Sequence, residues 1–407
     1  MDKTYERVLR GIKVADQDHA LRLLPCLVAA IRPLRVEELA EVVAFDFDDE
    51  SGIPKLKPSL RWKDQEQRLS ASCSSLIIIV ESGLSRVVQF SHSSVKVFLT
   101  SPRLATQSLD VSRYQVALGA AHTILAETCL SVFLDSLIED GNVEKPSPLA
   151  EYAAEHWVRH AQFEDVASRI KGIEYLFDKD KPYFAAWCRL HDIDVPPSPP
   201  SVFFEFTPIS KSGANTPLYY AALCGFQNLA EQLIIKDPHQ VRAIGGYYLT
   251  PAVAALAGRH FQLAQVLHRN GSSLEPRGDS GNTPLHCAAS YDDFEMVQVL
   301  LNCKVDVNVQ NDFGSTPLDS AMRGHLNDPS VVRLLLDHGA DPNVLVPGNV
   351  TPLHLASQYG MVEIAHLLVK RGASVEIQTQ WGKTPLDVAS GEQRDEIIKL
   401  LLDHRAK

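Results

Sequence analysis

In the second half of the chain, short apolar segments recur at a nearly constant interval and are separated by polar ones. The strings VVRLLLDHGADPN from Val331 and EIAHLLVKRGASVE from Glu363 place apolar residues at positions i, i+3 and i+4 before a glycine. This spacing predicts amphipathic helices that bury one face and end at the glycine. A Thr-Pro pair opens each repeating unit. Because Thr accepts an early backbone N–H and Pro has no hydrogen bond to lose there, the pair indicates a helix start.

The Thr-Pro pairs are evenly phased. Each pair opens one version of the same motif, for example TPLHCA, TPLDSA or TPLHLA, and the steps between them are 34, 33, 33, 35 and 33 residues. The threonines are Thr216, Thr250, Thr283, Thr316, Thr351 and Thr384. The motif and its period resemble the ankyrin repeat over about 200 residues. One helix pair cannot cover its own apolar face, so the six units are expected to stack into a solenoid.

Two different regions precede the repeats. Val195 to Ser201 holds four prolines and predicts a boundary or stiff linker, and Ser147 to Leu190 is helical in pattern. Earlier still, helices are expected at Lys3–Ile12, Asp16–Ile31 and Val36–Val43. A hairpin at Leu76–Val80 and Arg86–Phe90 and a helix from Ser94 are expected to follow them. Three helices followed by a hairpin indicate a winged-helix module.

The segments TYERVLRGI, IRPLRVEELAEVVAFDF, SHSSVKVFLTS and YAAEHWVRHAQ occur in this order before the repeats. Together they resemble the region that follows the nucleotide-binding module in fungal NACHT-ankyrin proteins of the STAND class, which are linked to self-recognition and defence signalling. In that group a P-loop module precedes the TYER helix. The sequence has no Gly-x4-Gly-Lys-[Ser/Thr] string, so we expect no nucleotide hydrolysis and no cofactor.

Composition and charge narrow the function further. The formal net charge is −11 and both halves are mildly acidic, which argues against nucleic-acid binding. The recognition helix of a winged-helix DNA binder would lie near Asp64–Ser75, which carries two acids and one Arg. The longest uninterrupted apolar run, Leu23 to Ile31, is too short for a membrane span. Seven scattered cysteines suit a reducing compartment, so we expect a cytoplasmic location, with the nucleus as the alternative.

Two histidine motifs are candidates for catalytic or metal sites. His156 and His160 have a zinc-compatible i, i+4 spacing, but no third ligand is near in sequence, and a structural or surface role is favoured. His286 is followed by Cys287, which raises a thiol nucleophile as a possibility. However, His286 and His354 occupy the ankyrin position at which the resemblance implies a bond between repeats. We therefore predict no catalytic, cofactor-binding or metal-binding residue.

The preferred candidate site is the variable surface of the repeats. An ankyrin array presents its hairpin tips and inner helices to partners, and exposed aromatic residues are frequent hot spots of protein interfaces. Aromatic residues fall at these tips and at the ends of inner helices, and the alternative for each is packing against a neighbouring hairpin. The predicted partner-binding residues are Tyr247, Tyr248, Tyr291, Phe313, Tyr359 and Trp381.

These observations predict a mainly α fold. The expected domains are a small winged-helix-like α/β domain at 1–135, a helical connector with the proline-rich linker at 136–205, and six ankyrin repeats at 206–407. The predicted function is a non-enzymatic interaction scaffold or adaptor that binds a protein partner and neither nucleic acid nor membrane. Two alternatives stay open: an enzyme with a cleft between connector and repeats, and the sensor half of a nucleotide-switched receptor.

Overall fold

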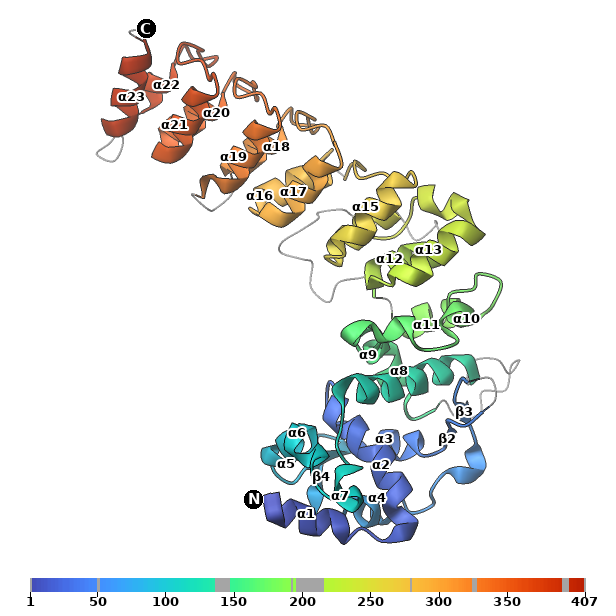
Figure 1. Cartoon of the computed structure of the whole chain (residues 1–407). Coiled ribbons are helices and arrows are strands. Elements are labelled where there is room, and N and C mark those ends of the chain that lie inside the picture. Colours follow the sequence, from blue (N-terminus) through green and yellow to red (C-terminus); the bar gives the residue numbers. More distant parts are fainter. Residues whose placement is uncertain are drawn as a thin grey trace. The chain divides into compact units, whose positions relative to one another are not determined.

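The computed structural model describes residues 2–49, 52–135, 147–191, 193–194, 216–278, 280–323, 328–389 and 395–405. Within these residues the chain divides into two compact units, one ending at Ile193 and the other beginning at Asp194. Helices make up most of both units (Figure 1). The proline-rich linker expected from Val195 to Ser201 lies outside the described residues.

The first part of unit 1 contains the three helices that the apolar pattern predicts, each ending one or two residues earlier than expected. A small sheet and several short helices follow them. The elements are α1 (Asp2–Arg10), α2 (Val14–Ala29), β1 (Leu34–Arg35), α3 (Val36–Val42), β2 (Phe45–Asp46), β3 (Lys55–Leu56), η1 (Pro58–Leu60), α4 (Gln65–Cys73), η2 (Ser74–Leu76), β4 (Ile77–Ser82), β5 (Ser85–Phe90), α5 (Ser93–Thr100), α6 (Pro102–Ala105) and α7 (Leu109–Ser112).

The expected hairpin forms most of a three-stranded antiparallel sheet. Strand β5 lies in the middle, with β1 on one side and β4 on the other, and Val80 pairs with Val87 in the hairpin. Both strands extend further toward the turn than expected, because the turn uses only Gly83 and Leu84. Gly83 has a φ of 60°, the left-handed region that two-residue hairpin turns require. Three helices and this sheet confirm the fold class expected for the region.

The remaining helices of unit 1 pack around one long helix, α8. In Figure 1 α8 lies between the helices of the first 112 residues and the helices that follow it, and it contacts both α2 and α9. An aromatic cluster centred on Trp157 joins Phe133 of α8 to Phe177 and Trp187. The elements are α8 (Leu118–Asp135), α9 (Ala150–Gln162), η3 (Phe163–Ser168), α10 (Ile173–Leu176) and α11 (Tyr183–Leu190).

By length and composition α8 is long and apolar enough to cross a membrane, the one such helix within the described residues. Its mean hydropathy is 1.2 over 18 residues, although Glu127 interrupts its apolar sequence. Ten of its residues, from Ala121 to Leu134, are buried inside the unit. A buried core helix shares this profile with a membrane span, and α8 has the packing of a core helix.

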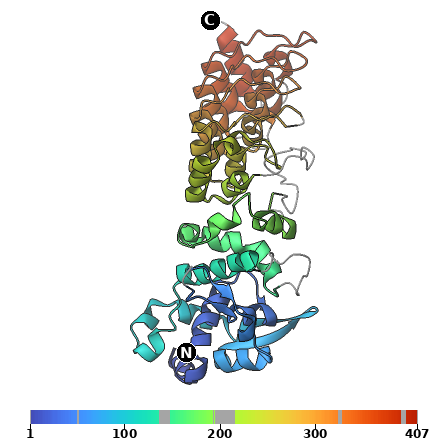
Figure 2. The ribbon, with the colours of Figure 1, turned by 90° about the vertical axis from the view of Figure 1, so that its right-hand side faces the viewer.

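Unit 2 is a stack of helix pairs, one pair for each Thr-Pro motif (Figure 1). Figure 2 shows the loops of the last repeats gathered along one side of the stacked helices. The elements are α12 (Pro217–Cys224), α13 (Gln227–Lys236), η4 (Pro238–Arg242), α14 (Pro251–Ala257), α15 (Phe261–Arg269), α16 (Pro284–Ser290), α17 (Phe294–Asn302), α18 (Pro317–Arg323), α19 (Pro329–Asp337), α20 (Pro352–Tyr359), α21 (Val362–Lys370), α22 (Pro385–Val388) and α23 (Asp395–Arg405).

The local chemistry of each repeat agrees with the sequence. Proline is the first residue of every inner helix, and in five repeats the preceding Thr hydroxyl accepts the backbone N–H three residues later, at 3.2 to 3.4 Å. Gly271, Gly339 and Gly372 follow outer helices with φ between 91° and 102°. The inward residues Leu353 and Ala356 are completely buried. The predicted stacking of the repeats is therefore confirmed.

Two asparagines join consecutive repeats in the same way. The side-chain amide of Asn308 donates to the Gly339 carbonyl at 3.0 Å, and its oxygen accepts the N–H of Asp341 at 2.8 Å. Asn343 repeats this arrangement with the Gly372 carbonyl at 3.0 Å and the Ser374 N–H at 2.7 Å. Each amide satisfies one acceptor and one donor at the end of the next outer helix.

Candidate protein-binding surface

The aromatic residues at the repeat tips are held by short hairpin-like loops, which we call fingers. A finger is the segment of about five residues immediately before the opening Thr of a repeat. In two of them, the N–H of Asn311 donates to the Ser315 carbonyl at 3.0 Å, and the N–H of Thr379 donates to the Lys383 carbonyl at 2.8 Å. These bonds close the loop, so the residue midway along it points away from the helices.

Phe313 and Trp381 occupy the equivalent tip position of two fingers, and both are exposed, by 63% and 68%. Their backbones are fixed, since the N–H of Phe313 donates to the Asn311 side chain at 3.0 Å and that of Trp381 to the Thr379 hydroxyl. The indole of Trp381 lies beside Gly348 of the preceding finger.

Tyr291 and Tyr359 lie at the ends of two inner helices, as the sequence predicts. Tyr359 is the last residue of α20 and is 58% exposed, and Tyr291 follows the last residue of α16 and is 41% exposed. Exposed aromatic side chains thus occur on both parts of the repeat that the sequence analysis proposed, the fingers and the ends of inner helices.

Tyr247 and Tyr248 are different, because both are half-buried at the start of the array. The N–H of Tyr247 donates to the carboxylate of Asp194 at 2.8 Å, and the N–H of Tyr248 donates to the Tyr219 hydroxyl oxygen at 3.0 Å. The Tyr219 hydroxyl in turn donates to Asp194, which is buried. Burial raises the pKa of Tyr248 to about 12. Part of each side chain is thus committed to the fold of the first repeats.

Two further apolar residues of the repeats are exposed, and the sequence pattern did not predict them. Leu345, six residues before Thr351, is 49% exposed in the segment that leads to the fifth finger. Phe294 opens α17 three residues after Tyr291 and is also partly exposed. Leu345 differs in exposure from Val344 and Val346 on either side, which are both buried. The apolar sequence of the three residues does not show this difference.

The histidines at the motif position bond between repeats, as expected. His286 Nδ1 accepts from the N–H of Thr283 at 3.2 Å, and its Nε2 donates to the Ser315 carbonyl at 2.9 Å in the next finger. His354 makes the corresponding bonds to Thr351 and Lys383. Burial lowers the pKa of both imidazoles, which keeps them neutral. With both nitrogens of His286 engaged, it is not placed to act as a base for Cys287.

The His156 and His160 pair does not form a shared site. His160 is fully buried, with Nδ1 at 2.8 Å from His122 Nδ1 and Nε2 at 2.9 Å from the Tyr152 hydroxyl. The Tyr152 oxygen also accepts the N–H of Ile31 at 3.3 Å. Burial lowers the pKa of His160 to about 3. A structural role is therefore supported for His160.

The helix proposed for DNA recognition, α4, is nearly neutral. Its Glu66 pairs with Arg86 of β5, and its one arginine, Arg68, lies 5.4 Å from the ring centroid of Trp62 and 3.6 Å from Asp16. With one glutamate and one arginine, α4 carries no net positive charge for phosphates. The absence of nucleic-acid binding stays a prediction.

Comparison with known families agrees with this architecture. Residues 252–346 and 326–407 match ankyrin repeats (3 copies), and residues 5–109 match the winged-helix domain of GPI inositol-deacylase. The chain carries an N-terminal winged-helix domain followed by ankyrin repeats. The winged-helix type is one found in NACHT proteins, which agrees with that part of the resemblance. Ankyrin repeats suggest a role in protein–protein interaction.

Three relatives match between 12% and 67% of the chain. The azaphilone pigments biosynthesis cluster protein L of Monascus ruber is 29% identical over 292 residues, which is 67% of this chain and 60% of that protein. The serine/threonine-protein kinase VIK of Arabidopsis thaliana is 37% identical over 83 residues, 20% of this chain and 18% of the kinase. YahD of Escherichia coli (strain K12), named as an ankyrin repeat protein, is 44% identical over 50 residues, 12% of this chain and 25% of YahD. The chain therefore spans three fifths or less of these relatives.

Proposed function

We propose that this protein is a non-enzymatic adaptor that captures a folded protein partner on the exposed aromatic residues of its ankyrin repeats. The observation that carries the proposal is the exposure of four aromatic side chains at repeat tips and inner-helix ends. Large, rigid aromatic rings lose little conformational entropy on binding and are enriched at interface hot spots. The four residues are Tyr291, Phe313, Tyr359 and Trp381.

We expect Tyr247 and Tyr248, which are half-buried, to contribute less to partner binding than the four exposed aromatic residues. Because Tyr247 and Tyr248 are half-buried, their side chains border the surface and also pack within the first repeats. Their replacement would combine a loss of binding with a loss of stability.

The biological setting that we propose is self-recognition or defence signalling in a fungus. It rests on the resemblance to NACHT-ankyrin proteins, on the type of winged-helix domain and on a relative from Monascus ruber. All seven cysteines are free thiols, which supports a location in the cytoplasm or nucleus.

Affinity capture with matched variants tests the adaptor function. The full chain and a Phe313→Ala, Tyr359→Ala, Trp381→Ala variant serve as baits in lysate of the source organism, and captured proteins are identified by mass spectrometry. A control bait carries Tyr175→Ala and Ile235→Ala, which remove two exposed apolar side chains elsewhere. We expect a protein retained by the natural and control baits and lost from the triple variant. Identical protein sets from all three baits would contradict the proposal.

A further inference from the structure

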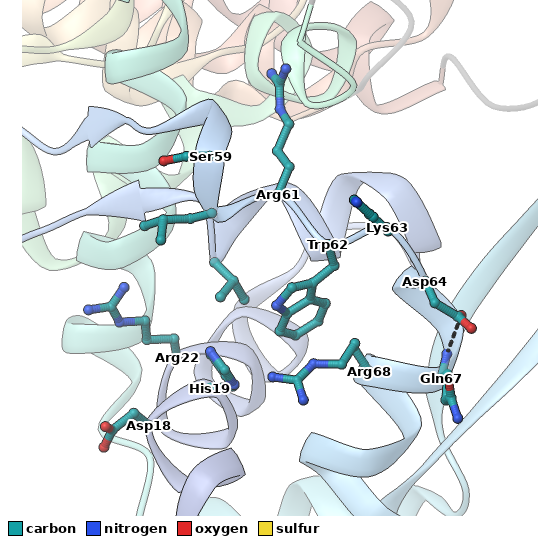
Figure 3. A pocket seen from close by; sticks show the side chains of 12 residues that line it. Asp18, His19, Arg22, Ser59, Arg61, Trp62, Lys63, Asp64, Gln67 and Arg68 are labelled. Atoms are coloured by element: carbon teal, nitrogen blue, oxygen red, sulfur yellow. Dashed lines mark hydrogen bonds between the residues drawn. The ribbon is translucent and has the colours of Figure 1, made fainter.

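The winged-helix domain contains a hollow of about 590 Å³, which we call the Trp62 pocket. Its walls come from the N-terminal half of α2, from residues 59–64 and from α4 (Figure 3). The volume is within the range of roughly 300–1,000 Å³ typical of ligand sites. The lining combines basic side chains with an apolar strip, an arrangement that suits a ligand with both acidic and apolar parts.

One arginine of the lining is already neutralised. Arg61 Nε lies 2.9 Å from Oε2 of Glu41, and its Nη2 contacts the other carboxylate oxygen. Because Glu41 is buried, this two-bond pair is fixed. Figure 3 shows the Arg61 side chain extending away from the other basic residues of the pocket, so it belongs to the wall of the domain.

Two other arginines keep most of their donors available. Arg22 donates one bond to the Phe45 carbonyl at 3.1 Å and has no carboxylate partner within the described residues. Arg68 forms an ion pair with the buried Asp16 at 3.6 Å, which is beyond hydrogen-bonding distance and leaves its N–H donors unused by that carboxylate. Since a guanidinium has five N–H donors, both groups are able to bind further acceptors.

A third group on the same side of the pocket lacks a partner. His19 lies between Arg22 and Arg68, and its ring meets Trp62 edge-on with the centroids 5.1 Å apart (Figure 3). Its Nδ1 is buried and has no hydrogen-bond partner among the described residues. Because solvent does not reach this atom, a ligand in the pocket would meet the other parts of the His19 ring.

The rest of the lining decides the class of ligand. Val43, Leu60 and Trp62 provide an apolar strip, and Asp18 and Asp64 add negative charge to the wall. A phosphate chain is anionic along its whole length, so part of it would lie beside Asp18 or Asp64, whereas a peptide can place its acidic groups only at the basic side chains. A peptide carries acidic side chains for the arginines, apolar side chains for the strip and backbone N–H groups for the aspartates.

We propose that the Trp62 pocket binds an acidic, leucine-containing segment of a protein, with its carboxylates at Arg22, Arg68 and His19. The site is independent of the ankyrin surface, so its failure would leave the adaptor proposal standing. It also gives the winged-helix domain a binding function of its own. The site includes α4, which has no net positive charge with which to bind DNA.

The test uses the full chain and two labelled hexapeptides in fluorescence anisotropy titrations. One peptide alternates glutamate with leucine, and its control alternates glutamine with leucine. We expect the acidic peptide to bind about tenfold more tightly, and Arg22→Gln and Arg68→Gln each to weaken it by about tenfold, since each removes a charged hydrogen bond. The control Arg86→Gln removes equal charge from an arginine that pairs with Glu66 outside the pocket, and should change affinity less than twofold.

A second measurement follows the NMR signal of the His19 ring, which should shift on peptide binding in the natural chain and in Arg86→Gln. Equal affinity for both peptides, or unchanged affinity in both pocket variants, would overturn the proposal. Glutarate binding as tightly as the peptide would assign the pocket to small acids instead. Tighter binding of a twelve-base-pair DNA duplex, weakened by the same two variants, would assign it to nucleic acid and overturn the proposal.

Discussion

The indole ring of Trp381 lies against Gly348, which occupies the equivalent tip position of the preceding finger. A Cβ atom at Gly348 would lie 3.3 Å from Cη2 of Trp381, and the N–H of Gln380 donates to the Gly348 carbonyl at 2.8 Å. The side chain nevertheless remains largely exposed. One side of the ring is therefore held by a neighbour while the rest faces solvent, an arrangement that preorganises an anchor for binding.

The first prediction concerns Trp381→Ala. If the ring is an anchor, the substitution should weaken partner binding by about 2 kcal/mol or more, because hot-spot residues carry most of the binding energy. Stability should change little, since most of the ring is already exposed. Affinity and melting temperature are measured on the same variant. A protein that melts early but binds normally would show that Trp381 only supports the fifth finger.

Gly348→Ala tests the contact from the other side. Gly348 has a φ of 92°, so an alanine there costs roughly 1–2 kcal/mol of stability and also pushes on the Trp381 ring. Gly339→Ala is the matched control, with a φ of 91° and nothing within 4 Å of the added atom. We expect similar losses in urea unfolding and weaker partner binding for Gly348→Ala alone. Equal affinities would mean that the position of the indole does not matter.

Leu353→Ala tests the register of the repeats. Leu353 is completely buried in α20, so truncation should cost about 2–5 kcal/mol in urea unfolding through lost burial and a residual cavity. Leu345→Ala removes the same atoms from a half-exposed position and should cost under about 1 kcal/mol. A Leu353→Ala loss below 1 kcal/mol would contradict the register.

The stability of unit 1 should depend on pH through His160. Its folded pKa is about 3 against an ordinary value of 6.5, so below pH 6.5 the unfolded chain binds a proton that the folded unit does not. Stability from this residue is complete above pH 6.5 and falls by roughly 1 kcal/mol per pH unit as the pH drops from there toward 3. The fluorescence of buried Trp157 and Trp187 in urea titrations at pH 5 and pH 7 measures the change. His160→Gln should reduce this dependence, and an unaltered slope would refute the assignment.

Nucleotide binding provides the last prediction. The sequence has no phosphate-cradling P-loop, so calorimetric titration with Mg-ATP should show no heat of binding. A saturable signal at micromolar nucleotide would revive the interpretation of this chain as part of a nucleotide-operated switch.

The parts of the structure that depend on local chemistry were predictable from the sequence. For example, Thr351 caps its helix and His354 bonds to the next finger. Both roles follow from the short motif itself, because the two residues are only three positions apart. The bounds of the repeat helices follow from Thr-Pro pairs and terminal glycines for the same reason.

Contacts between residues that lie far apart in the sequence could not be predicted from any local motif. Asp194 lies outside the repeating pattern, and nothing in its neighbourhood indicates that Tyr219 and Tyr247 would bond to it. The contact of Trp381 with Gly348 joins residues 33 positions apart and depends on how two fingers pack. The Trp62 pocket brings together three separate segments, and its unpaired groups became visible only when their neighbours were known.

Asn308 and Asn343 each make the same two hydrogen bonds to the repeat that follows. One of these two junctions could therefore replace the other. If residues 309–343 were removed, Asn308 would take the place of Asn343 and meet the same carbonyl of Gly372 and the same N–H of Ser374. The shortened array would keep a complete junction and lose one finger. Duplication or loss of a repeat is thus a route by which such a gene changes the reach of the partner surface without redesigning its joints.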